Sequence, residues 1–148
     1  MAEYVYNPVQ VVLPNQPVIL DDSIPCNRGY VYHRNQSGNL ILRGITPNCF
    51  ARYQVTFNGN IAVPTDGTVG TIAVALAIDG EPILTSRAIV TPAAVDEYFN
   101  VTSTAIITVP KGCCFSISVE NVSEGATAAD TPTAINVQNA NLVVNRIA

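Results

Sequence analysis

Residue types that commonly carry chemistry are scarce in this chain. Its 148 residues include no tryptophan, one histidine, and seven cations of which only Lys111 is a lysine. Charged residues make up 12% of the chain, about half of the usual share in soluble proteins. Because nucleic-acid binding depends on neutralising phosphates, the lack of any basic cluster in the sequence argues against a nucleic-acid groove. So little charge covers a free monomer poorly, and we expect part of the surface to be buried by partners.

Long apolar runs and helical patterns are missing as well. No window of the sequence approaches 18 uninterrupted apolar residues, and the opening MAEYVYNPVQ has no basic segment followed by an apolar run. We therefore expect neither a membrane span nor a signal peptide. Apolar residues do not recur at the i, i+3, i+4 and i+7 spacing of an amphipathic helix, so helices are not predicted.

The chain offers no recognisable catalytic or metal-binding set. Its sole histidine, His33, would need a nucleophile and an orienting acid to act as a general base, and it has no second histidine to share a metal. The single histidine also disfavours a cupin-type enzyme, because cupins hold a metal with several histidines and a glutamate. The adjacent acids Asp21-Asp22 and Asp96-Glu97 lack the spacing of a calcium loop and are interpreted as solvated turn charges. We predict no catalytic residue, no metal and no cofactor.

The four cysteines form a poor disulfide framework. Cys113 and Cys114 are adjacent, so their side chains would point to opposite faces of a strand. Buried free thiols are the main interpretation. A bridge between Cys26 and Cys49 is the alternative once the protein has left a reducing cell.

Short alternating runs separated by turn residues recur along the whole chain. This pattern predicts an all-β, antiparallel sandwich of about ten strands, because parallel strands would need helical crossovers. The expected strands are Val9–Val12, Pro17–Leu20, Gly29–Arg34, Leu40–Arg43, Phe50–Val63, Thr71–Asp79, Pro82–Val90, Tyr98–Val109, Cys114–Asn121 and Ala134–Ile147. Residues 122–133, rich in small residues, read as an exposed loop.

Residues 71–79, TIAVALAID, alternate without a polar side. One face would carry large aliphatic residues and the other Ala73, Ala75 and Ala77. A strand with one solvated face should be polar there, whereas a row of alanines allows another surface to come close. We predict that the alanine row lies in an interface between subunits, so that Ala75→Glu would split the assembly. A second sheet of the same subunit is the alternative.

Other strands alternate cleanly between apolar and polar residues. In residues 52–57, RYQVTF, every second residue is apolar, and residues 115–119, FSISV, behave in the same way. Their polar sides carry little charge. Such a side suits water, and it equally suits a polar contact between subunits.

The chain reads as a single domain, in which residues 1–20 form an extended arm with the first strands and residues 21–148 form the sandwich. In the arm, Tyr4 and Tyr6 are candidates for docking on a neighbouring subunit. Tyr30, Tyr32 and Tyr98 are the aromatic residues that could contact a glycan, although core packing is the competing interpretation for each.

The order of the motifs resembles a known family. The runs ARYQVTFNGNIAV, GTIAVALAIDGEPI, TSTAIITVPKGCCFSISVENV and AINVQNANLVVNRIA follow the plan of the C-terminal domains of bacterial collagen-like spore-surface proteins. The plan is also similar to that of tumour necrosis factor and complement-head domains. Residues 6–34 resemble small prophage-encoded proteins of gut Firmicutes that decorate capsids or form head fibres.

The resemblance implies a jelly roll that forms a threefold homotrimer. It implies a structural, non-enzymatic role on a virion surface, in contact with the major capsid protein or another virion component. The alternative that it implies is a glycan-binding or receptor-binding module of a phage fibre or of a bacterial spore or cell surface, with host glycans as partners.

Overall fold

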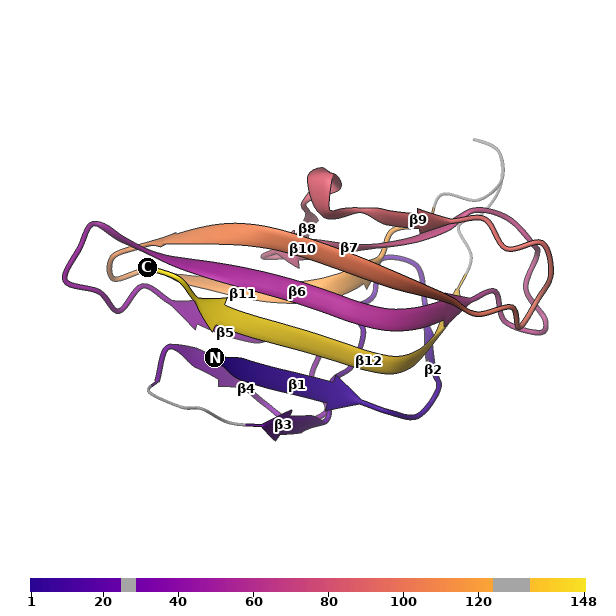
Figure 1. Ribbon diagram of the computed structural model, residues 1–148, viewed down its shortest axis with the longest axis horizontal. Helices are drawn as coiled ribbons and strands as arrows, with labels where there is room; N and C mark the ends of the chain where they lie inside the picture. The colour runs from indigo at the N-terminus through magenta and orange to yellow at the C-terminus, as the bar shows by residue number, and fades with distance from the viewer. Residues whose placement is uncertain (25–28, 124–133) are drawn as a thin grey trace.

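The computed structural model describes residues 1–24, 29–123 and 134–148, and its regular secondary structure is almost entirely β-strand (Figure 1). The strands are β1 (Ala2–Tyr6), β2 (Gln10–Val12), β3 (Asp22–Ile24), β4 (Val31–His33), β5 (Leu40–Arg43), β6 (Phe50–Ala62), β7 (Ile72–Ile78), β8 (Glu81–Pro82), β9 (Ala88–Val90), β10 (Phe99–Pro110), β11 (Cys114–Asn121) and β12 (Ile135–Arg146). A single 3₁₀ turn, η1 (Leu84–Ser86), interrupts the strand that was predicted over residues 82–90. None of the described helical turns is long and apolar enough to cross a membrane.

The strands form two packed sheets. Sheet A has the order β10-β6-β12-β1-β3, and β2 pairs with β12 next to β1. Sheet B has the order β4-β5-β11-β7-β8, and β9 pairs with the first part of β7. All of these pairings are antiparallel. The predicted fold class, an all-β antiparallel sandwich, is confirmed.

Three long strands, β6, β10 and β12, run side by side along the length of the molecule (Figure 1). The pairing of β12 with β6 shifts register between Gln138 and Asn141, where Asn139 has a φ of 55°. Asparagine tolerates this left-handed conformation better than most residues. Because of this bulge, β12 pairs with β2 before Gln138 and with β1 after Asn139.

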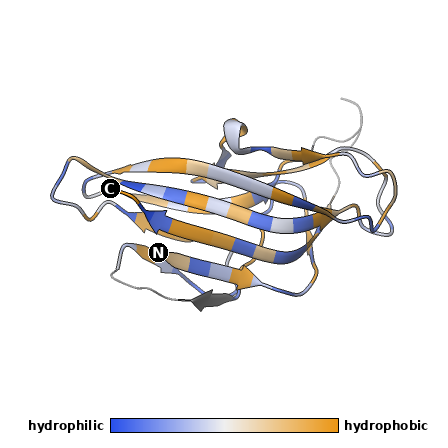
Figure 2. Ribbon diagram, in the orientation of Figure 1, coloured by the Kyte–Doolittle hydropathy of each residue, from blue (hydrophilic) through white to orange (hydrophobic). Residues whose placement is uncertain are grey.

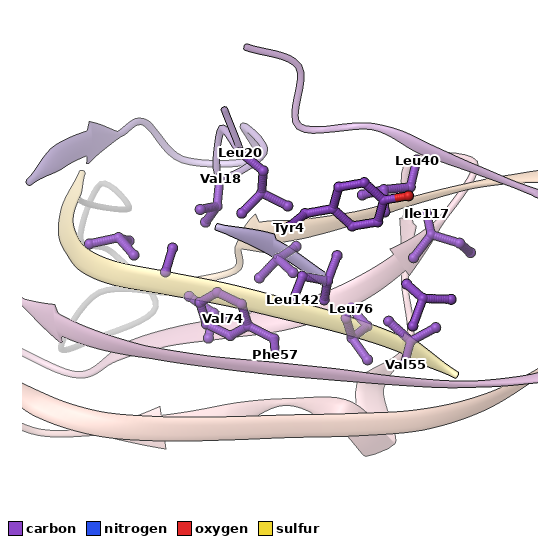
Figure 3. Packing of buried hydrophobic residues seen from close by; sticks show 14 of the residues in the cluster. Tyr4, Val18, Leu20, Leu40, Val55, Phe57, Val74, Leu76, Ile117 and Leu142 are labelled. Atoms are coloured by element: carbon purple, nitrogen blue, oxygen red, sulfur yellow. The ribbon is translucent and has the colours of Figure 1, made fainter. Parts of the chain in front are cut away.

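The core lies between the sheets and is built from alternate residues of each strand. In β6 the inward residues Tyr53, Val55 and Phe57 are fully buried, as the alternation of this segment predicts. Figure 3 shows Val55 and Phe57 packed near Leu76 of β7 and Leu142 of β12. Each such aliphatic or aromatic side chain contributes about 2 kcal/mol when it is removed from water.

The N-terminal residues are part of this core, which corrects the prediction of an arm. They form β1, which lies between β12 and β3 in sheet A. Tyr4 is only 3% exposed, and Tyr6 packs partly buried against the core cluster. The physical reason is the alternation of AEYVY, which turns Ala2, Tyr4 and Tyr6 inward. Neither tyrosine is therefore extended toward a neighbour, and no boundary separates residues 1–20 from the sandwich.

The cysteines also differ from the prediction. Cys49, Cys113 and Cys114 are exposed free thiols: Cys49 lies in the connection before β6, Cys113 lies between β10 and β11, and Cys114 is the first residue of β11. The buried-thiol interpretation is wrong for these three residues. Cys26 lies outside the described residues, and with it the predicted alternative of a bridge to Cys49.

Candidate functional site

The outward side of sheet A is a broad face of uncharged polar residues. It is formed by alternate residues of β6, β10 and β12, whose other side fills the core, and this alternation is visible in Figure 2. We call the following twelve residues the amide face: Gln54, Thr56, Asn58, Asn60, Asn100, Thr102, Thr104, Ile106, Gln138, Asn141, Val143 and Asn145.

The pairing register arranges the amide face in rows across the strands. Thr102 of β10 lies opposite Asn58 of β6, which in turn lies opposite Asn141 of β12. The next row along the strands runs from Thr104 through Thr56 to Val143 in the same way. Every member is half-buried or exposed in the single chain, so the side chains are available to a partner.

Hydrogen bonds between strands hold parts of this face in place. The Asn100 side-chain amide donates to Oδ1 of Asn58 at 2.7 Å and to Oδ1 of Asn60 at 3.2 Å. The hydroxyls of Thr56 and Thr104 lie 3.0 Å apart. The Oδ1 atoms of Asn58 and Asn60 can each accept a further hydrogen bond, since a carbonyl oxygen has two lone pairs. The face is thus partly ordered before any partner binds.

The amide face itself contains no charged residue, and charge is found only at its borders. Arg52 lies beyond it at one end of β6, with its guanidinium 4.8 Å from the centroid of the Phe50 ring. Glu3 of β1 lies at the side and accepts a hydrogen bond from the Asn141 side chain. A face of this size without charge is unusual on a free protein surface, which normally mixes charges of both signs.

Exposed aliphatic residues adjoin the polar rows. Ile106 of β10 is 64% exposed within the amide face. At the edge of the same sheet, Val11 of β2 is 63% exposed, and Val9 and Leu13 are exposed at alternate positions beside it. The edge is held by Gln10, whose side-chain amide donates to the Ile19 carbonyl at 2.9 Å and accepts from the Ile19 amide at 2.8 Å. Polar rows with scattered apolar contacts are typical of interfaces that are not permanently buried.

The predicted interface of Ala73, Ala75 and Ala77 has a different environment. All three alanines of β7 are fully buried within the single chain. The opposite side of β7 packs in the core as predicted, but the alanine row leaves no surface on which a neighbouring subunit could lie in this structure.

The strand beside the alanine row carries a buried acid. Glu120 of β11 lies opposite Ala75, is only 8% exposed, and is 3.3 Å from the Ser118 hydroxyl. Burial raises the pKa of Glu120, the Ser118 hydrogen bond lowers it to a smaller extent, and the nearby Glu81 raises it further. The Glu120 carboxyl group therefore favours protonation more than a free glutamate does.

The three tyrosines proposed for glycan contact do not form one platform. Tyr30 lies near the C-terminal end of β10. Its carbonyl accepts a hydrogen bond from the Arg43 amide, and Arg43 pairs with Cys114, which follows β10 closely in the sequence. Tyr98 directly precedes the other end of β10, so the two are separated by the length of a strand of 12 residues, about 36 Å. Tyr32 is 55% exposed, whereas Tyr30 packs against the core. Their role in glycan contact stays a prediction.

The absence of a metal or catalytic set stays a prediction. No group of three or more His, Cys, Asp or Glu side chains that could hold a metal occurs among the described residues. The His33 ring is half-buried, with Nε2 2.9 Å from the Ser37 carbonyl and its centroid 4.7 Å from that of Tyr4. Glu97 accepts from the amides of Ala93 and Ala94, so it stabilises its own turn.

Comparison with known proteins places the fold. No protein-family model matches the sequence, and no curated protein matches it either. The structure is similar to the globular domain of zebrafish complement 1qA protein, with a TM-score of 0.62 and 14% identity over 99% of this chain and 96% of that one. It is also similar to murine APRIL, with a TM-score of 0.56 and 12% identity over 93% and 98% of the two chains. The chain therefore has a complement 1q/tumour-necrosis-factor-like jelly-roll fold.

Proposed function

We propose that this protein is a structural, non-enzymatic homotrimer whose subunits associate through the amide face. The observation that carries the proposal is the combination of exposure with a complete lack of charge on this one face. Charged residues are depleted in the centre of interfaces, because burying an unpaired charge costs several kcal/mol. Amide and hydroxyl groups can instead exchange their hydrogen bonds with water for hydrogen bonds with the same groups of a second subunit.

The size of the face fits such a contact. Strands of about 12 residues that rise about 3.3 Å per residue and lie about 4.8 Å apart give three strands a flat area of roughly 600 Å². A standard specific interface buries about 800 Å² per partner. The exposed edge at Val11 and Leu13 would supply the remaining contact beside the polar rows.

The threefold order and the place of the protein on a virion belong to the same proposal. They are supported by the resemblance of residues 50–148 to trimeric heads and of residues 6–34 to prophage-encoded decoration or head-fibre proteins. In this proposal the trimer sits on the particle surface beside the major capsid protein. Host-glycan contact would be a role of the exposed Tyr32 and not of a three-tyrosine platform.

The first experiment measures the mass of the purified protein by multi-angle light scattering at micromolar concentration and about 0.5 M salt. The proposal expects the mass of three chains of 15.7 kDa. A mass of one chain across the micromolar range would contradict it. The virion assignment is tested separately, by probing purified particles of the host's prophage with an antibody to this chain. Absence of the chain from intact particles would contradict that part alone.

A further inference from the structure

Some of the charged residues of the chain are grouped by sign at the two ends of the sandwich. At one end, leftmost in Figure 1, the connection before β6 meets the turn between β10 and β11. The Lys111 amide donates to the Cys49 carbonyl at 2.9 Å, and the Gly44 amide donates to the Cys113 carbonyl at 2.8 Å. We call this the basic end, because four cations, and no acid, lie in this turn or on the nearby strand residues of β5, β6 and β12. They are Arg43, Arg52, Lys111 and Arg146.

The opposite end, rightmost in Figure 1, is acidic. There the connection after β6 meets the segment before β10, since the Asp96 amide donates to the Val63 carbonyl at 2.8 Å and the Thr65 hydroxyl donates to Asp96 at 2.7 Å. Asp66, Asp96 and Glu97 lie on these segments, and residues 63–71 and 91–99 contain no cation. We call this the acidic end.

The two ends cannot neutralise each other within one chain. They are joined by β6, which has 13 residues and so spans about 40 Å. Exposed charges are screened beyond about 10 Å at ordinary ionic strength. Among the described residues no acidic side chain pairs with any of the four cations. Within the part of the chain that the structure describes, each end thus presents charge of one sign that no oppositely charged side chain neutralises, although Arg146 Nε donates to the Ala148 carbonyl at 3.2 Å.

Two arginines of the basic end are fixed in direction by aromatic rings. The Arg146 guanidinium lies 4.1 Å from the centroid of the Tyr30 ring, and Arg52 lies over Phe50. The Tyr53 hydroxyl beneath Arg146 donates to the Arg43 carbonyl at 2.6 Å, which fixes the backbone at this point. Cations that are already ordered lose less entropy when they bind an anionic surface.

We propose that the basic end binds the acidic end of a second copy of this chain, so that copies stack end to end. Such a contact is heterologous, because it joins two different surfaces, and it extends into a column when the rotation does not close. The residues of both ends lie outside the amide face, so the two contacts involve different sets of residues. If the proposed trimer is correct, each junction carries three such contacts at once, which strengthens a contact that is weak by itself.

Two multiple variants test the proposal, each altering exposed residues at one end only. The basic-end variant combines Arg43→Glu, Ile45→Glu and Lys111→Glu; the acidic-end variant combines Asp66→Lys, Thr68→Lys and Val69→Lys. None of these side chains lies in the core or on the amide face. Leu84→Glu, which alters an exposed residue away from both ends, is the matched control.

The measurement is sedimentation velocity at about 20 mM and about 0.5 M salt, because screening is weak in the first and strong in the second. A thiol reductant is present throughout, since Cys49, Cys113 and Cys114 are exposed at the basic end. The wild type and the control are expected to form multiples of their high-salt unit at low salt. Each end variant alone should remain at that unit. An equimolar mixture should associate again, because the native acidic end of one variant meets the native basic end of the other.

A wild type that stays at its high-salt unit in low salt would overturn the proposal, and so would an end variant that associates as the wild type does. A wild type that binds a polyanion at low salt but does not self-associate would also overturn the proposal, because the basic end would then bind a different anionic partner. The high-salt mass reports on the trimer independently. If the wild type has the mass of one chain at high salt and still forms multiples of it at low salt, the proposed trimer is contradicted. The proposal of end-to-end binding is then still supported.

Discussion

The two outer faces of the sandwich share a strand pattern of period two and differ in what covers them. On sheet B the outward row of β7 is alanine and is fully buried within the chain. On sheet A the outward rows of β6, β10 and β12 are amides and hydroxyls that remain accessible. Small residues on a strand therefore indicate close packing, but they do not indicate which surface packs against them. An uncharged polar face that stays exposed is the better indicator of a missing partner.

The largest expected effect comes from a charge in the alanine row. Ala75→Glu places a carboxylate where the native side chain is fully buried, and an unpaired buried charge costs about 3 to 5 kcal/mol. We expect the free energy of unfolding, measured with urea at high salt, to fall by that amount. A variant with unchanged stability that no longer forms trimers would restore the alanine row as the subunit interface.

A smaller effect is expected from removing a buried amide. Asn121 is fully buried; its side-chain Nδ2 donates to the Val12 carbonyl at 3.0 Å and its Oδ1 accepts from the Ser123 hydroxyl at 2.6 Å. Asn121→Ala leaves these buried groups without their partner, which costs about 1 to 3 kcal/mol.

The matched variant on the exposed face is Asn100→Ala, which removes an amide that also donates two hydrogen bonds. Water can replace these bonds in the monomer, so we expect a loss of about 0.5 kcal/mol. Urea unfolding of both variants at concentrations where the chain is monomeric measures the contrast. Equal losses of unfolding free energy in Asn121→Ala and Asn100→Ala would contradict the distinction between a buried and an exposed amide.

The smallest effect is on the pH dependence of stability. Because burial raises the pKa of Glu120, the folded chain binds its proton more tightly than the unfolded chain does. Its stabilising contribution is complete below the ordinary pKa of 4.5 and is lost as the pH rises through the raised value. Glu120→Gln, which keeps an acceptor for Ser118, should therefore be more stable than the wild type at pH 7, with a difference that narrows toward pH 4.5. A difference in the free energy of unfolding that stays the same at every pH would refute this assignment.

Much of the fold follows from alternation alone. The segment RYQVTF indicates which side of β6 enters the core, and the structure confirms it with Tyr53, Val55 and Phe57 fully buried. Periodicity assigns residues to faces, but it does not tell which strands become neighbours. For this reason AEYVY was interpreted as an arm although its own alternation fits β1, an interior strand of sheet A.

The candidate site was only partly visible in the sequence. The weakly charged polar side of residues 52–57 already pointed to water or to a polar subunit contact, but the register that joins it to Asn100 and Asn141 comes from pairing across 40 positions or more. The exposed cysteines escaped prediction for a similar reason, since a thiol at a turn is packed against little whatever its residue type prefers. The separation of charge between the two ends also depends on which connections meet in space.

The most direct test of the account places one charge in the middle of the amide face. Asn58→Asp replaces an exposed amide of β6 by a carboxylate of the same shape, and Asn39→Asp makes the same change at an exposed position away from that face. Masses measured by light scattering at micromolar concentration and about 0.5 M salt should show three chains for the wild type and for Asn39→Asp, and one folded chain for Asn58→Asp. A trimer that survives Asn58→Asp unchanged would contradict the assignment of this face as the interface.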